Sequence, residues 1–158
     1  MKNKATLTII QGFIGAGKST FSKKLSLETG AVHLNPDERI SKTFDRTFYM
    51  NNWDECFHFV TKQLWNETKT YLNNGKDVIF DMGFWKKIDR DYARKIAQDC
   101  HADLKLYYLS VPDDILKARI LADRPPEWAK IHLQNFDKNK ALFEEPSDDE
   151  NAIVIKNY

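Results

Sequence analysis

The stretch GFIGAGKST at residues 12–20 constrains the fold more than any other part of the chain, because it combines three glycines with a lysine and two hydroxyls. It meets the pattern G-x-x-x-x-G-K-S through Gly12, Gly17, Lys18 and Ser19. A β-branched run precedes it and a helical segment follows it. In that setting the glycines let successive backbone N–H groups point inward at a phosphate, and the following helix directs its positive N-terminal end at the same anion.

We therefore predict that this loop binds the phosphates of a nucleotide, rather than forming a glycine turn with a chance lysine. Lys18 would add a full charge near the β- and γ-phosphates, and the hydroxyl of Ser19 would contact Mg²⁺. The loop alone does not say whether a phosphoryl group is transferred. The predicted nucleotide-binding residues of the loop are Gly12, Phe13, Ile14, Gly15, Ala16, Gly17, Lys18, Ser19 and Thr20.

Strands and helices alternate along the rest of the chain. Short apolar or β-branched runs predict strands at residues 6–11, 31–35, 77–81, 104–110 and 152–155. Apolar positions at helical spacing predict helices at residues 18–30, 53–71, 88–100, 113–123 and, less regularly, 127–143. This alternation indicates an α/β protein with helices on both faces of a parallel sheet. The length of 158 residues fits one domain over residues 1–158.

Composition excludes several function classes. The formal net charge of +1 gives no broad attraction to nucleic acid, and no apolar run is long enough to cross a membrane. The first ten residues contain only a strand-length apolar run, so we expect no signal peptide and a cytoplasmic protein. Cys56 and Cys100 lack the spacing of metal ligands, as do the four histidines.

Two aspartates follow strands at the sheet edge where α/β proteins bind ligands. In NPDER (35–39), Asn35 can cap a helix, so Asp37 either stabilises the helix dipole or accepts a proton from a substrate hydroxyl. The two roles are compatible, and a position in the first helical turn predicts a low pKa for Asp37. Asp81 ends the third strand. It is either a turn residue or a ligand of Mg²⁺, and the glycine loop favours the metal role.

Arginines and tryptophans supply further candidates. Arg119 and Arg124 flank a double-proline break, and guanidinium groups beside a mobile segment suit phosphate clamping, so we predict a lid at about 124–136. The alternative is two solvated helix arginines. Trp85 follows the third strand and is a candidate wall of an acceptor site. Trp53 belongs to an apolar helical stripe, for which core packing is favoured.

The motifs GFIGAGKST, NPDER, VIFDMGFW and KARILADR, in this order, resemble the small P-loop kinases. That family includes zeta toxins, chloramphenicol phosphotransferase and the kinase domain of polynucleotide kinases. The resemblance covers nearly the whole chain. It implies a three-layer P-loop NTPase fold whose parallel five-stranded sheet has the order 2-3-1-4-5.

The resemblance also implies roles for individual residues. Asp37 would be the general base, and Arg39 would contact the acceptor. Asp81 would assist Mg²⁺, while Arg119 and Arg124 would stack on the nucleobase or grip phosphates. The run GFW, followed by Lys87 and Arg90, is similar to members known only as ATP-binding proteins. We place Trp85 and Arg90 on the acceptor side, where the substrate residues are predicted to be Asp37, Arg39, Trp85 and Arg90.

Together these features predict a kinase that uses ATP and Mg²⁺ to phosphorylate a hydroxyl of a small molecule. Lys18, Asp37 and Arg124 would be catalytic, and Ser19 and Asp81 would hold the metal. One alternative is a nucleotide-binding switch or weak NTPase without an acceptor, against which the presence of Asp37 weighs. Another is a polynucleotide 5′-hydroxyl kinase, which would need a basic groove that the overall charge does not indicate.

Overall fold

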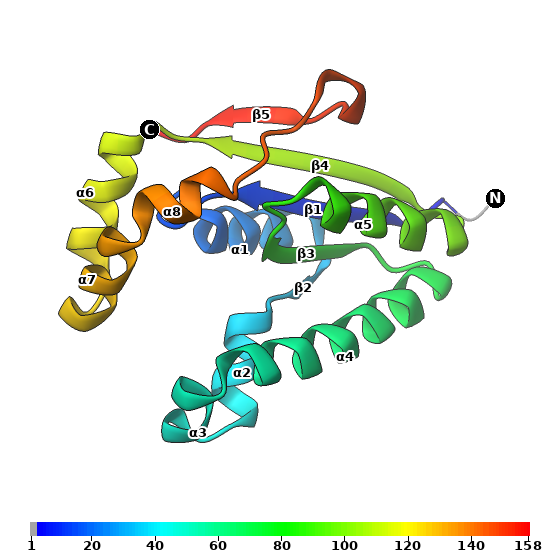
Figure 1. The fold of residues 1–158 in the computed structure, drawn as a ribbon. Helices are drawn as coiled ribbons and strands as arrows, with labels where there is room; N and C mark the ends of the chain where they lie inside the picture. Colours follow the sequence, from blue (N-terminus) through cyan, green and yellow to red (C-terminus); the bar gives the residue numbers. More distant parts are fainter. Residues whose placement is uncertain (1–2) are drawn as a thin grey trace.

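The protein folds around a five-stranded parallel sheet, which a computed structural model describes for residues 3–158 (Figure 1). The strand order is β2-β3-β1-β4-β5, so the predicted fold class and sheet order are confirmed. β1 lies at the centre, where Leu7 is in register with Val78 of β3 and with Leu104 of β4. The strands are β1 (Thr6–Gly12), β2 (Val32–Leu34), β3 (Val78–Gly83), β4 (Asp103–Ser110) and β5 (Ile153–Lys156).

Helices cover both faces of the sheet. They are α1 (Lys18–Thr29), α2 (Pro36–Thr43), α3 (Arg46–Asn51), α4 (Trp53–Asn73), α5 (Lys87–Asp99), α6 (Asp113–Asp123), α7 (Pro126–Gln134) and α8 (Phe136–Ala141), with a 3₁₀ turn, η1 (Asp148–Glu150). None of the helices within residues 3–158 is both long and apolar enough to cross a membrane.

Alternation along the central strands divides the core into two layers. Leu7 and Ile9 of β1, with Phe80 of β3, belong to the layer that packs against α4 and α5. Ile10 and Ile79, which point to the other face, belong to the layer that packs against α1 and α6. This period of two follows from the pleat of a strand, because successive side chains leave opposite faces. The two layers hold the carboxyl ends of β1 and β3 rigidly side by side.

The prediction of a single helix at residues 127–143 is wrong, because this segment forms two helices. α7 ends at Gln134, and α8 begins at Phe136 after a turn at Asn135. The turn lets the ring of Phe136 become buried, with its centroid 5.1 Å from the ring of Phe13. Burial of an aromatic ring outweighs the loss of a few helical hydrogen bonds, so tertiary packing divides the helix.

Arg90 lies in the core and not on the acceptor side, so its predicted substrate contact is wrong. Its side chain is fully buried and forms two hydrogen bonds with Glu150, of 2.8 and 2.9 Å. It also donates to the carbonyl oxygens of Phe84 and Glu144, each at 3.1 Å. Arg90 therefore ties the segment after α8 to the loop after β3, and this bridge supports the neighbouring Trp85.

The buried pair of Arg90 and Glu150 leads to a prediction about the stability of the protein. Hydrogen bonds from Arg90 and Arg94 lower the pKa of Glu150, so its carboxylate stabilises the fold above the usual carboxyl pKa and loses this contribution as pH falls. Glu150→Gln is expected to lower the free energy of unfolding at pH 7 by about 2 kcal/mol. The difference in free energy of unfolding between the variant and the wild type should become smaller at acid pH. Urea unfolding at several pH values would measure it.

Asp148→Asn is the matched control, because Asp148 is an exposed neighbour in the same 3₁₀ turn. It should change the free energy of unfolding by no more than about 0.5 kcal/mol. Glu150→Gln could instead lower the free energy of unfolding by the same amount at neutral and at acid pH. That result would show that the charge of Glu150 does not stabilise the bridge.

Candidate active site

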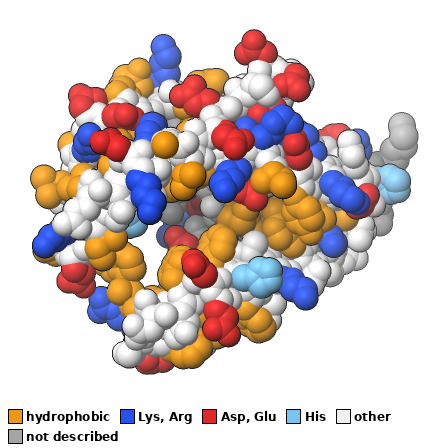
Figure 2. Space-filling view, in the orientation of Figure 1, with side chains coloured by type: hydrophobic (Ala, Val, Ile, Leu, Met, Phe, Trp, Pro, Cys, Tyr) orange, Lys and Arg blue, Asp and Glu red, His pale blue; other side chains and the backbone are white. Residues whose placement is uncertain are grey.

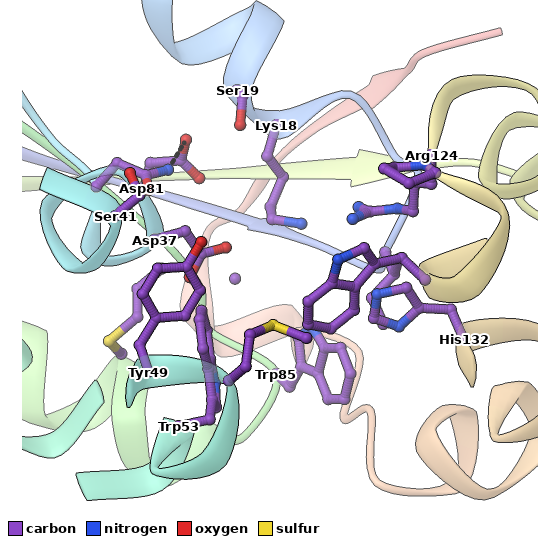
Figure 3. Close-up of a pocket in the computed structure, with 17 residues that line it drawn as sticks. Lys18, Ser19, Asp37, Ser41, Tyr49, Trp53, Asp81, Trp85, Arg124 and His132 are labelled. Atoms are coloured by element: carbon purple, nitrogen blue, oxygen red, sulfur yellow. Dashed lines mark hydrogen bonds between the residues drawn. The ribbon is translucent and has the colours of Figure 1, made fainter. Parts of the chain in front are cut away.

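A cavity of about 750 Å³ opens at the carboxyl ends of β1, β2 and β3 (Figure 3). Its size is that of a small-molecule site. The space-filling view shows a hollow flanked by hydrophobic side chains (Figure 2). Seven of the sixteen predicted site residues line this cavity, namely Ile14, Lys18, Ser19, Asp37, Asp81, Trp85 and Arg124.

The glycine loop has the conformation that a phosphate-binding loop requires. Gly15 and Gly17 have φ values of 84° and 88°, in the left-handed region that L side chains rarely adopt. The loop also has no room for a side chain at Gly17, because a Cβ atom there would lie 2.6 Å from the side-chain nitrogen of Asn157. The first residue of α1 is Lys18, so the N-terminal end of the helix follows the loop directly. A glycine loop followed by a helix N-terminus can bind an anion, so this geometry is consistent with the predicted phosphate site.

Lys18 and Arg124 bring positive charge to the cavity. Lys18 reaches it from the start of α1, and Nζ donates to the carbonyl oxygen of Phe13 at 3.2 Å. Desolvation lowers the pKa of Lys18, while the nearby charges of Asp81 and Asp37 oppose this shift and that of Arg124 adds to it. Both cations point into the cavity in Figure 3. A bound polyphosphate would neutralise this pair of like charges.

Asp81 is a buried carboxylate, only 3% exposed, and it lies two residues before the end of β3, which extends beyond the predicted strand to Gly83. Its Oδ2 accepts a hydrogen bond of 3.1 Å from the side-chain amide of Asn35 and lies 3.4 Å from Nε2 of His33. Asn35 also caps α2, because its Oδ1 accepts from the backbone N–H of Glu38 at 3.0 Å. The predicted cap is confirmed, and the same side chain links Asp81 to the helix that carries Asp37.

Asp37 projects from the first turn of α2 into the cavity. The low pKa predicted from its helical position is wrong. Desolvation by the surrounding protein raises the pKa of this carboxyl, and the negative charges of Asp81 and Glu38 add to the rise, against the opposing effects of Lys18 and Arg124. The effect of desolvation on the pKa of Asp37 is thus larger than the opposing effects of the helix N-terminus and of the two cations. A raised pKa makes Asp37 a stronger base.

Two predicted arginines lie outside the lining of the cavity. Arg39 forms a bidentate pair with Glu67, with N–O distances of 2.6 and 3.0 Å. Arg119 donates to the carbonyl oxygens of Gly15, at 3.4 Å, and of Asn157, at 2.7 Å. Arg119 therefore braces the glycine loop against the segment after β5. The donors of both arginines are directed at protein acceptors in this structure.

The sequence of the chain matches the family model of the AAA domain named AAA_33 over residues 7–146. This match spans the glycine loop, both aspartates, Arg119 of α6 and Arg124. The chain belongs to the AAA_33 family. Among curated proteins, no sequence matches this AAA_33 chain.

Solved structures resemble the AAA_33 chain at low sequence identity. A sugar kinase from Janibacter sp. HTCC2649 has 20% identity and a TM-score of 0.66, over 96% of this chain and 84% of that chain. Chaetomium thermophilum Kti12, in complex with ADP-AlF3, has 15% identity and a TM-score of 0.67, over 94% and 88%. Mycobacterium tuberculosis APS kinase CysC, in complex with AMPPNP and APS, has 15% identity and a TM-score of 0.61, over 96% and 88%. At these identities the likeness establishes the fold.

Sequence reasoning missed several residues that line the cavity of this AAA_33 protein. Trp53 was assigned to the core stripe, but it is 37% exposed and lines the cavity, while Val60 and Leu64 farther along α4 are fully buried. Other cavity residues that were not predicted as site residues include Tyr49, Met50, Trp128 and His132. Trp128 and His132 lie within the predicted lid, whereas the only sequence signal of Tyr49 and Met50 is an aromatic or sulfur-containing side chain beside a polar turn.

Trp85 does line the cavity, as predicted, and two contacts orient it. Its Nε1 donates to the carbonyl oxygen of Gly12 at 3.2 Å, and its ring stacks on Phe13 with centroids 5.0 Å apart. Both contacts are with the glycine loop. The indole therefore connects the wall of the cavity to the predicted phosphate site.

Proposed function

We propose that the protein is a kinase that uses ATP and Mg²⁺ and transfers the γ-phosphoryl group to a hydroxyl of a small molecule. The observation that carries this proposal is that one cavity is lined both by residues of the glycine loop and by a carboxylate from another element. Lys18 and Ser19 lie at the glycine loop, and Asp37 projects from another element, α2. A protein that only binds a nucleotide does not need a carboxylate of raised pKa beside its phosphate site.

The residues present fit ATP and Mg²⁺. The loop and the start of α1 would bind the β- and γ-phosphates, and the Kti12 and APS kinase structures contain nucleotide analogues. The hydroxyl of Ser19 and the carboxylate of Asp81 are oxygen ligands, which Mg²⁺ prefers. When bound, Mg²⁺ would neutralise charge between the β- and γ-phosphates.

In the proposed transfer, the acceptor hydroxyl gives its proton to the carboxylate of Asp37. The acceptor oxygen forms a bond to the γ-phosphorus, and the bond from that phosphorus to the bridging oxygen of ADP breaks. Lys18 and Arg124 stabilise the charge on the moving phosphoryl oxygens. No covalent intermediate with the enzyme is needed, because positioning and charge stabilisation account for most of the catalysis of phosphoryl transfer.

The decisive experiment is incubation with γ-labelled ATP and a panel of metabolites, antibiotics and a 5′-hydroxyl oligonucleotide, with products identified by mass. We expect a small molecule that gains one phosphoryl group, and roughly 100-fold less of this product, or lower still, with Asp37→Asn. Release of labelled inorganic phosphate alone would show an NTPase instead. A labelled oligonucleotide would assign the protein to the polynucleotide kinases.

The lid proposed at residues 124–136 makes a separate prediction. Arg124, Trp128 and His132 line the cavity, so closure over ATP should protect this segment from solvent. Hydrogen exchange measured by mass spectrometry should slow across 124–136 when a non-hydrolysable ATP analogue binds. The helix α5, on the sheet face away from the loop, serves as the internal control and should not change. Unchanged exchange in 124–136 at saturating analogue would exclude a lid.

A further inference from the structure

Ring side chains from several elements line the cavity. We call Tyr49, Trp53, Trp85, Trp128 and His132 the aromatic wall, since all five line the cavity. They come from α3, α4, the loop after β3 and α7. Two pairs contact each other, because Tyr49 and Trp53 have ring centroids 6.2 Å apart and Trp128 and His132 have centroids 5.9 Å apart. Figure 3 shows four of them around the space below Lys18 and Asp37.

Positive charge is confined to the phosphate side of the cavity. Among residues 3–158, the lysines and arginines in the lining are Lys18 and Arg124, which the transferred phosphoryl group would engage. Arg39, predicted to contact the acceptor, is held by Glu67 at 2.6 Å. Arg46, on α3, pairs with Glu127 at 3.3 Å. No cation of the lining is therefore left to bind a phosphate, sulfate or carboxylate group of an acceptor.

The negative charge of Asp37 points to the same conclusion. Asp37 lines the cavity, and its carboxylate would repel an anionic acceptor. An anion placed against the aromatic wall would also lose its hydration without gaining a charged partner, which is costly. A neutral ring, in contrast, gains contact area and stacking geometry against tryptophan and tyrosine.

We infer that the acceptor is an uncharged hydroxyl compound with a flat or apolar ring face, which stacks on the aromatic wall and presents its hydroxyl to Asp37. This inference rests on the proposed kinase function. It names the acceptor by its chemistry, which a flat aromatic ring or the apolar face of a sugar ring can supply. Acceptors that carry a phosphate, sulfate or carboxylate group are expected to be poor substrates.

Binding of matched pairs in the presence of ADP and Mg²⁺ tests this without requiring transfer. The pairs are a nucleoside and its 3′-monophosphate, an aryl alcohol and its ring carboxylate, and a methyl glucoside and the corresponding glucuronide. Three of the four tryptophans line the cavity, so intrinsic fluorescence reports its occupancy, while saturation-transfer NMR gives an independent measure. In each pair that binds, the neutral member is expected to bind roughly tenfold or more tightly.

The three pairs also distinguish the two ring types. Binding of the nucleoside or aryl alcohol indicates a flat aromatic face, and binding of the glucoside indicates a sugar face; either supports the inference. Anionic members that bind as tightly as their neutral partners would overturn it, and so would a panel in which no member binds. If the neutral compounds bind but are never phosphorylated, the proposed kinase function is wrong, while the inference that the ligand is uncharged is supported.

Variants of the wall test the stacking contact directly. Trp53→Ala is expected to weaken binding of the best neutral ligand roughly 5- to 10-fold, and Trp53→Phe should keep it within about twofold. Phe59→Ala is the control, because Phe59 is a half-exposed aromatic on the same helix outside the lining. Equal binding by the wild type and Trp53→Ala would overturn the stacking contact.

A new cation on the wall should weaken the preference for the neutral member of each pair. Met50 lines the cavity and is 39% exposed, so Met50→Arg adds a charge without filling a buried space. The anionic member of each pair is expected to gain at least fivefold relative to its neutral partner. Selectivity that is unchanged in Met50→Arg would show that the lack of a cation does not set the acceptor class.

Discussion

Lys18→Ala is expected to reduce phosphoryl transfer by roughly 100- to 1000-fold, because it removes the charge that stabilises the transferring group at the glycine loop. Nucleotide binding should weaken as well, since a charge-assisted contact is lost. The fold should persist, because the only hydrogen bond of the Lys18 ammonium among residues 3–158 is to the carbonyl oxygen of Phe13. Calorimetric titration with ATP and Mg²⁺ and a transfer assay would measure both effects.

Lys24→Ala is the control for this variant. Lys24 is on the same helix, is 76% exposed, and lies 3.9 Å from Glu28, so its removal should leave binding and transfer unchanged. The melting temperatures of both variants should stay within about 4 °C of the wild type. A folded Lys18→Ala protein with full ATP affinity and full turnover would exclude the proposed phosphate site.

Asp37→Asn is expected to leave ATP binding nearly normal and to reduce transfer by roughly 100-fold or more, because an amide keeps the shape of the side chain but cannot take the proton. Asp54→Asn is the matched control. Asp54 is also an aspartate in a first helical turn, that of α4, but it does not line the cavity. A role limited to the helix dipole would make the two variants alike, with losses of at most about 1 kcal/mol in stability and none in turnover.

The raised pKa of Asp37 predicts how transfer and stability depend on pH. The carboxylate is the reactive form, so the rate should rise as pH increases through the pKa of Asp37, above the ordinary value of 3.8, and then level off. A raised carboxyl pKa also means that the ionised form destabilises the fold above that pKa. At neutral pH Asp37→Asn should therefore melt no lower than the wild type. Near-normal turnover with a lowered melting temperature would leave Asp37 as a helix-end residue.

The sequence alone determined the features whose signals are local. The glycine loop is recognisable because a tight anion-binding turn needs glycine at fixed positions, and Gly15 and Gly17 do adopt left-handed conformations. The strands of the sheet are recognisable because buried parallel strands require apolar runs. The N-cap at Asn35 follows from the chemistry of a helix start, which involves only neighbouring residues. The order of the strands came from family resemblance and not from these local patterns.

Only the tertiary structure decided which polar and aromatic residues face the cavity. Arg39 and Arg90 look like substrate contacts in sequence, yet Glu67 and Glu150 occupy their guanidinium groups. Trp53 has the spacing of a core residue and still faces the cavity. The pKa of Asp37 depends on its hydration and on charges from other elements. In each case the deciding partner is far away along the chain, and local patterns carry no information about distant charges, packing or access of water.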